Sequence, residues 1–150
     1  MSSGTVPATE LGVRDQLQIQ TLIAQVCQAL DFSRPADFVA AFTPDGVYRI
    51  VSPDFDGRQE RYSHHGAEAL LEFARGMAAR RQGMARHWTT NLVIKSAGDG
   101  GATAVSYTML IEIDPDTKAR KILLTGVHED VLVRTAAGWR LASRTVVGDV

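Results

Sequence analysis

Several features that define large classes of proteins are scarce or missing in this sequence. It has one cysteine, Cys27, so an internal disulfide is excluded and a reducing cytoplasm is the expected location. No apolar run approaches the ~20 residues that a membrane-spanning helix needs, so we expect no membrane partner. The first ten residues, MSSGTVPATE, contain neither a basic cluster nor an apolar stretch, and we expect no secretory signal there.

An excess of positive charge is also missing. Lysine and arginine number 16 against 17 aspartates and glutamates, which gives a net charge of −1. Nucleic-acid-binding proteins usually carry a clear positive excess, so we expect no nucleic-acid partner. The histidines and carboxylates lack the spacing of a metal site, and the neighbouring His64 and His65 are poorly placed to chelate one ion, so no metal is expected.

The residues that are present are typical of a globular domain. Apolar residues make up 45% of the chain and charged residues 22%, and 150 residues are enough to enclose a hydrophobic core. Small and polar residues dominate the start of the chain. We therefore expect a flexible tail over residues 1–12 and a single domain over residues 13–150.

The spacing of apolar residues predicts helices first and strands second. Steps of three and four predict an amphipathic helix over residues 15–30, and further helices are expected over 33–42 and 67–81. From residue 86 onward, alternating runs joined by short turns predict three or four long antiparallel strands. This order predicts an α+β domain whose N-terminal helices pack on one face of a curved, mainly antiparallel sheet.

Asp31 directly follows the apolar stripe of the first helix and has two interpretations. It lies in line with Ala24 and Cys27 at helical spacing, so its carboxylate would face a cavity at the edge of the buried stripe. Aspartate is also common in turns and at helix N-termini, where it would cap the next turn. Spacing alone leaves both interpretations open.

Two histidines lie in predicted strands. Strict alternation in the strand at 86–95 puts one polar face against one apolar face: His87, Thr89, Asn91 and Val93 against Trp88, Thr90, Leu92 and Ile94. His87 is then either a satisfied core or edge residue or the first group of a polar pocket wall. His128 shares a face with Asp130, either as a hydrogen-bonded surface pair or as a pocket group.

Arginines form two further groups. Those in ARGMAARRQGMAR (74–86) form either a solvated basic face or a grip for an anionic substrate. On the last predicted strand, Arg140 and Arg144 are expected in ion pairs at the sheet surface, with the mouth of a pocket as the alternative place for Arg144.

Several segments, in this order, resemble the SnoaL-like branch of the nuclear-transport-factor-2-like superfamily: ALDFSRPADFVAAFTPDGVYRI, RHWTTNLVI, TGVHEDVLVR and GWRLASR. The resemblance covers residues 13–149. This branch is similar to scytalone dehydratase, ketosteroid isomerases, polyketide cyclases and the β-subunits of ring-hydroxylating dioxygenases. The resemblance implies a cone-shaped α+β barrel with a pocket between sheet and helices. It also implies subunits that pair or form trimers through the open face of the sheet.

The resemblance assigns roles to individual residues. In dehydratase-like members an aspartate that ends the first helix meets a histidine that starts a later strand, and Asp31 and His87 match these two places. His128 matches a second histidine of scytalone dehydratase, and Tyr48 matches a pocket tyrosine. These four residues are the expected catalytic group. The expected substrate-binding residues are Val26, Cys27, Asn91, Tyr107 and Met109, with Val26 standing where many members carry a tyrosine.

Together these residues predict an enzyme that needs no cofactor. His87, oriented by Asp31, would remove a proton beside a carbonyl, while His128 or Tyr48 would donate one. We expect a dehydratase, isomerase or cyclase that acts on a hydrophobic, ring-containing molecule such as a polyketide or steroid, in a homodimer or homotrimer. The alternative is a non-catalytic ligand-binding or structural subunit resembling a dioxygenase β-subunit.

Overall fold

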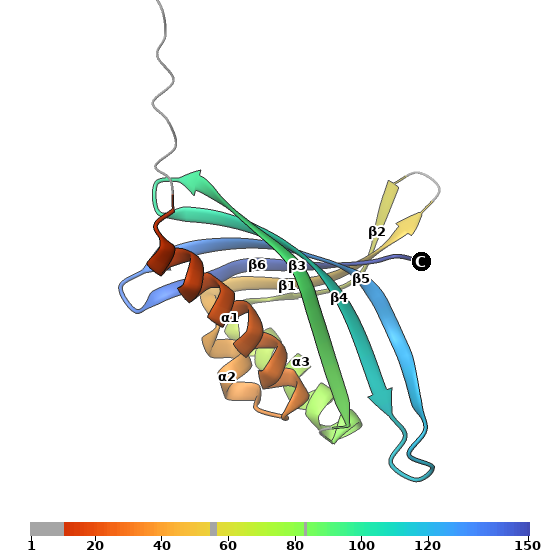
Figure 1. Cartoon of the computed structure of the whole chain (residues 1–150). Helices are drawn as coiled ribbons and strands as arrows, with labels where there is room; N and C mark the ends of the chain where they lie inside the picture. The colour runs from red at the N-terminus through yellow and green to blue at the C-terminus, as the bar shows by residue number, and fades with distance from the viewer. Residues whose placement is uncertain (1–10, 55–56, 83) are drawn as a thin grey trace, which may run out of the picture.

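Helices cover one side of a six-stranded sheet in the computed structural model, which describes residues 11–54, 57–82 and 84–150. The elements are α1 (Val13–Asp31), α2 (Pro35–Ala40), β1 (Phe42–Asp54), β2 (Gly57–His65), α3 (Gly66–Arg81), β3 (Ala85–Gly98), β4 (Gly101–Ile113), β5 (Arg120–Thr135) and β6 (Gly138–Gly148). Figure 1 shows the sheet curving around the helices, which lie on its concave side. The tail predicted over residues 1–12 falls almost entirely on residues 1–10, outside the described part.

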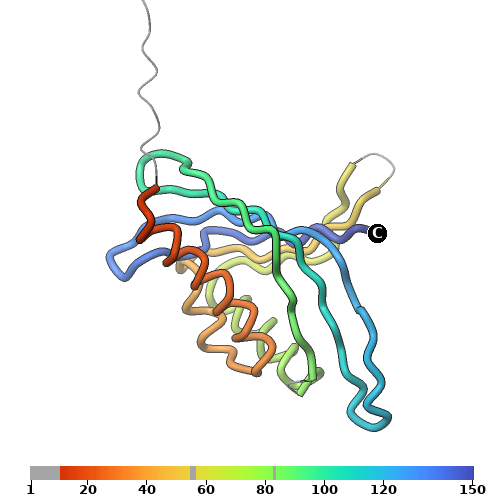
Figure 2. Tube along the Cα trace, in the orientation of Figure 1, coloured from red at the N-terminus to blue at the C-terminus, as the bar shows by residue number. Residues whose placement is uncertain are grey.

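The strands are arranged in the order β2-β1-β6-β5-β4-β3. Neighbouring strands are antiparallel except for β1 and β6, which are parallel. Strands β3 to β6 are antiparallel neighbours in sequence order, and β6, the last of them, pairs with β1. The C-terminal end of β6 lies beside the β1–β2 hairpin (Figure 2). The prediction of an α+β domain with helices on a curved, mainly antiparallel sheet is confirmed.

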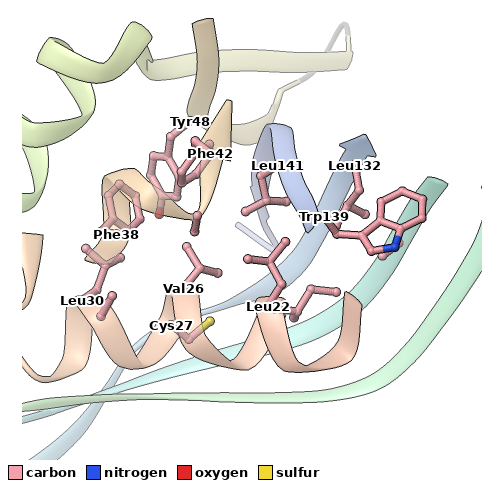
Figure 3. Packing of buried hydrophobic residues seen from close by; sticks show 14 of the residues in the cluster. Leu22, Val26, Cys27, Leu30, Phe38, Phe42, Tyr48, Leu132, Trp139 and Leu141 are labelled. Carbon is pink, nitrogen blue, oxygen red and sulfur yellow. The ribbon is translucent and has the colours of Figure 1, made fainter. Parts of the chain in front are cut away.

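The apolar stripe of α1 is buried against the inner face of the sheet. Figure 3 shows Leu22 and Val26 pointing from α1 toward Leu141 of β6. These three side chains are at most 8% exposed, and each fully buried side chain of this size contributes ~1.5–3 kcal/mol to the stability of the fold. Beside them, the rings of Phe38 and Tyr48 pack edge to face with centroids 5.7 Å apart. This packing holds the last turn of α1 against the strands that form the site.

A β-bulge in β3 corrects the predicted division of that strand into two faces. The pairing with β4 shifts between Thr90 and Val93, and Asn91 adopts a left-handed φ of 54°, which asparagine tolerates better than most residues. Beyond the bulge Leu92 and Ile94 turn inward, onto the side of His87. Trp88 does not pack in the body of the domain, because its side chain is 61% exposed on the opposite face.

The outer face of the sheet, away from the helices, is unusually apolar. Five large exposed side chains define it: Trp88, Val93, Val105, Tyr107 and Val131. Their strands are neighbours, so these side chains form one contiguous surface rather than isolated exposures. Over the described residues, no helix is long and apolar enough to cross a membrane.

Candidate active site

A cavity of about 410 Å³ lies between the inner face of the sheet and the helices. Its polar lining includes Tyr48, His64, His87 and His128, and apolar groups such as Phe73 complete its walls. This volume is within the ~300–1,000 Å³ of typical small-molecule sites. A larger open groove between α1 and the β5–β6 turn is lined, among the described residues, by neither a histidine nor a carboxylate, so these residues supply no group for acid–base chemistry there.

His87 and Asp31 form the best-defined polar contact in the cavity wall. The ring Nδ1 of His87 lies 2.6 Å from Oδ1 of Asp31, and its backbone N–H donates to Oδ2 at 2.9 Å. Both side chains are nearly buried, at 9% and 5% exposure. A carboxylate only accepts hydrogen bonds, so in the neutral ring Nδ1 carries the proton and Nε2 keeps its lone pair for a ligand.

The local fold explains how Asp31 reaches a residue 56 positions later. Asp31 is the last residue of α1, and the apolar stripe that ends at Leu30 presses this helix end against the start of β3. The capping interpretation of Asp31 is therefore wrong, because both of its oxygens accept hydrogen bonds from His87. Asp31 is also absent from the cavity lining, because it lies behind His87 and contacts the cavity only through that residue.

His128 occupies the β5 wall in a different environment. Its side chain is 3% exposed, and within the described residues Nδ1 has no hydrogen-bond partner. Burial, together with the positive charge of Arg144 and that of His87 whenever its ring is protonated, holds the pKa of His128 well below its usual value. The ring is therefore neutral at pH 7 and carries one N–H donor.

Behind His128, Asp130 and Arg144 form a buried ion pair. The two oxygens of Asp130 accept from Nε and Nη2 of Arg144, each at 2.8 Å, and Nη1 of Arg144 donates to the Cys27 thiol at 3.4 Å. Burial disfavours the charge on Arg144, but the Asp130 carboxylate outweighs it and raises the arginine's pKa. The alternative of a His128–Asp130 surface pair is therefore wrong. Arg144 forms an ion pair, as expected, but the pair is buried rather than at the sheet surface.

A second bulge accounts for the position of Arg144. The pairing of β5 with β6 shifts between Val131 and Leu132, which leaves Ala142 as an extra residue in β6. Leu141 and Arg144 thus both point inward, although strict alternation places them on opposite faces. The sequence alternation alone gives no sign of this extra residue.

Tyr48 and His64 face the cavity from adjacent strands, where they are direct cross-strand partners. The Phe73 ring stacks on Tyr48 at 4.9 Å and lies 4.6 Å from His64. Burial raises the pKa of Tyr48 to about 12, so its hydroxyl stays protonated. Burial also lowers the pKa of His64. Sequence reasoning missed His64, although two adjacent histidines on a strand must face opposite sides and one must point inward.

None of the five predicted substrate-binding residues lines this cavity. Val26 and Cys27 lie on α1 and are buried in the hydrophobic core of the domain, and Asn91 is exposed in the β3 bulge. Tyr107 and Met109 lie on the outer face, because the even-numbered residues of β4 point inward. From that strand the cavity receives Thr108 and Leu110 instead. In the described residues, no group of three or more histidine, cysteine or carboxylate side chains is arranged to hold a metal ion.

Comparisons with known proteins give one family model and several similar structures. The family model described as a SnoaL-like domain matches residues 12–145. A structure of a variant of Rv3472, a protein of unknown function from Mycobacterium tuberculosis, is 29% identical with a TM-score of 0.75 and covers 92% of this chain and 78% of that one. A Catenulispora acidiphila protein in complex with S-DNPA is 28% identical, with a TM-score of 0.73 and coverage of 91% and 95%.

A more distant likeness concerns the fold alone. A candidate scytalone dehydratase from Novosphingobium aromaticivorans shares 17% identity, with a TM-score of 0.75 and coverage of 92% of this chain and 86% of that one. At this level of identity the two proteins share the arrangement of helices and strands. This similarity does not imply that they catalyse the same reaction.

Proposed function

The chain belongs to the SnoaL-like domain family, with its nuclear-transport-factor-2-like fold, and we propose that it is a cofactor-free acid–base enzyme for a hydrophobic, ring-containing molecule. The observation that carries the proposal is the 2.6 Å contact between Asp31 and His87 at the wall of a cavity. The relative that holds S-DNPA supports binding of a small molecule in this family. Dehydration, isomerisation and cyclisation all begin with the proton removal that such a pair performs.

His87 is the base in this proposal. Its Nε2 takes a proton from the carbon beside a substrate carbonyl, and the electrons of that C–H bond pass into an enolate. Asp31 keeps the proton of the neutral ring on Nδ1 and faces the positive charge that the ring gains. Assistance of this kind is typically worth ~10²–10⁴-fold in rate.

His128 and Tyr48 act as hydrogen-bond donors to the enolate oxygen. His128 is neutral at pH 7, because its pKa lies well below the usual value, so it stabilises negative charge with its N–H rather than by giving up a proton. The Tyr48 hydroxyl, with a pKa of about 12, does the same. In a dehydration, the proton on His87 then passes to the leaving hydroxyl, the C–O bond breaks, and water departs as the double bond forms.

The apolar outer face of the sheet supports assembly into a homodimer or homotrimer. Trp88, Val105 and Tyr107 are exposed there, and large exposed apolar surfaces commonly mark protein interfaces. The same surface would suit the alternative function, a non-catalytic ligand-binding or structural subunit. The free thiol of Cys27 suits a reducing cytoplasm, where we expect the protein to act.

The proposal is tested with 5-nitrobenzisoxazole, an apolar ring compound that opens when a base removes a single proton. We expect the protein to open it faster than an equal concentration of free imidazole, and His87→Ala to lose ~10²-fold or more of that rate. His65→Ala is the matched control, because this exposed histidine lies outside the cavity. Rates of the protein and His87→Ala within about twofold, or no rate above imidazole, contradict the proposal.

A further inference from the structure

The charged lining of the cavity has a single sign. Arg80 and Arg81, at the C-terminal end of α3, both line it, together with the three histidines described above. Among the described residues, the lining contains no aspartate or glutamate. Asp31 lies behind His87, and its two oxygens are occupied by that residue. From the described part of the chain, a ligand in this cavity therefore meets cationic and neutral groups only.

Arg81 is the member of this group that lacks a partner. Among the described residues, its guanidinium is in no ion pair within 4.0 Å and in no hydrogen bond. Burial nevertheless lowers its pKa, and the carboxylates whose charges reach it, Glu112 and Asp31, act only from a distance. Half-buried guanidinium groups in proteins are usually paired with an anion, so the missing partner points to a ligand.

The other arginines of α3 show that a half-buried guanidinium without an anionic partner is a feature of Arg81 and not of the basic helix end as a whole. Arg75 is exposed and does not line the cavity. Arg80 is exposed as well, and its Nη2 donates to the sulfur of Met77 at 3.2 Å. These two fit the solvated basic face expected from the sequence, whereas Arg81 fits the grip for an anionic substrate.

We propose that the substrate carries a carboxylate on its ring system and that Arg81 binds this carboxylate. The inference rests on the proposed function, since it places the reacting carbon at His87 and the substrate ring against the stacked aromatic side chains of Tyr48 and Phe73. A guanidinium presents parallel N–H donors that match the two oxygens of a carboxylate. Arg81 thus selects the substrate and sets its orientation, while His87 performs the proton transfer.

The test uses two probes of equal size that differ in charge, 2-naphthoate and 2-naphthamide, with binding measured by isothermal titration calorimetry at pH 7. We expect the protein to bind the carboxylate at least about tenfold more tightly than the amide, the difference typical of one charge-assisted contact. Arg81→Gln should reduce this preference to within twofold. Arg75→Gln removes the same charge from the exposed side of the same helix and should keep the preference.

Three outcomes overturn the inference. Equal binding of both probes, or binding of neither, shows that the cavity does not select a carboxylate. An equal loss in Arg75→Gln and Arg81→Gln shows a general effect of net charge. The inference also fails separately from the proposed function: if 5-nitrobenzisoxazole opening depends on His87 while naphthoate is not preferred, only the carboxylate assignment is wrong.

Discussion

The β3 wall and the β5 wall of the cavity each present a histidine, in opposite electrostatic surroundings. His87 on β3 has a carboxylate 2.6 Å from its ring, supplied by the end of α1. His128 on β5 has no such partner among the described residues, and the nearby Arg144 is positively charged. The carboxylate closest in sequence to His128, Asp130, is committed to that arginine.

This difference separates the roles of two identical side chains. A carboxylate on Nδ1 prepares His87 to accept a proton at Nε2, whereas burial beside a cation keeps His128 neutral and suited to donating a hydrogen bond. The two roles depend on the neighbour of each strand. The end of α1 supplies Asp31 to His87 of β3, whereas the bulged strand β6 supplies Arg144 beside His128 of β5. We therefore expect these surroundings, rather than the histidines themselves, to decide the chemistry.

Replacing Asp31, the carboxylate that contacts His87 of β3, should have the largest effect on the reaction rate. Asp31→Asn keeps an oxygen for the backbone N–H of His87 but no longer fixes the ring proton on Nδ1, so we expect 5-nitrobenzisoxazole opening to fall ~10²–10⁴-fold. Circular dichroism should show an unchanged fold. The control, Asp37→Asn, removes an exposed carboxylate of α2 and should keep the full rate. If the rate of Asp31→Asn falls less than twofold, the carboxylate beside His87 does not explain the different roles of the two histidines.

The carboxylate of the β5 wall should matter for stability instead. Asp130→Asn leaves the buried charge of Arg144 without its partner, and we expect a loss of about 3–5 kcal/mol in the free energy of unfolding. Glu129→Gln breaks the neighbouring pair with Arg58, which is solvent-exposed, and should change stability far less. Urea denaturation measures both. Similar losses in the two variants contradict the assignment of a buried ion pair behind His128.

The neutral state of His128 predicts how stability depends on pH. In the unfolded chain this histidine takes up a proton near pH 6.5, whereas in the folded protein it stays neutral to lower pH. The unfolded state therefore binds more protons below pH 6.5, and stability falls as the pH drops, by up to ~1.4 kcal/mol per pH unit.

The variant His128→Gln should lose less stability between pH 7.5 and pH 5.5 than the parent protein, as measured by urea denaturation at both values. His64 remains in both proteins, so its own lowered pKa cancels in the difference. The exposed His65→Gln should behave like the parent. Equal pH dependence in the parent and His128→Gln means that His128 titrates normally in the folded state.

The smallest effect on catalysis is expected from the outer face. Tyr107 is 54% exposed on the side of the sheet away from the helices, so Tyr107→Ala should leave 5-nitrobenzisoxazole opening within about twofold. If this face joins subunits, light scattering should show a lower mass for the variant. A loss of activity above tenfold with an unchanged mass would return Tyr107 to the site.

The sequence was sufficient for the larger features because they depend on repeated patterns. The stripe of α1 and the long alternating strands recur over many residues, so single irregularities do not hide them. Family resemblance, rather than spacing, brought Asp31 and His87 together. The faces of β3 and β6 were not predictable, because one extra residue at Asn91 or Ala142 reverses every later side chain.

His64 was missed, and Arg81 was not singled out among the arginines of residues 74–86, for a related reason. Only the tertiary packing of α3 against β1 and β2 turns both side chains toward a common cavity. The local sequence shows that a residue is charged or aromatic. The curvature of the sheet decides whether its side chain lies in the same cavity as the other polar and aromatic groups.

Nitrogen-15 NMR of the histidine rings tests the division between the two walls most directly. We expect the neutral ring of His87 to carry its proton on Nδ1 and to leave Nε2 unprotonated, and we expect this preference to weaken in Asp31→Asn. We also expect His128 to show the chemical shifts of a neutral ring at pH 6.5, where a histidine in the unfolded chain is half protonated. A His87 ring protonated on Nε2 alone, or a His128 that titrates near pH 6.5, contradicts the account.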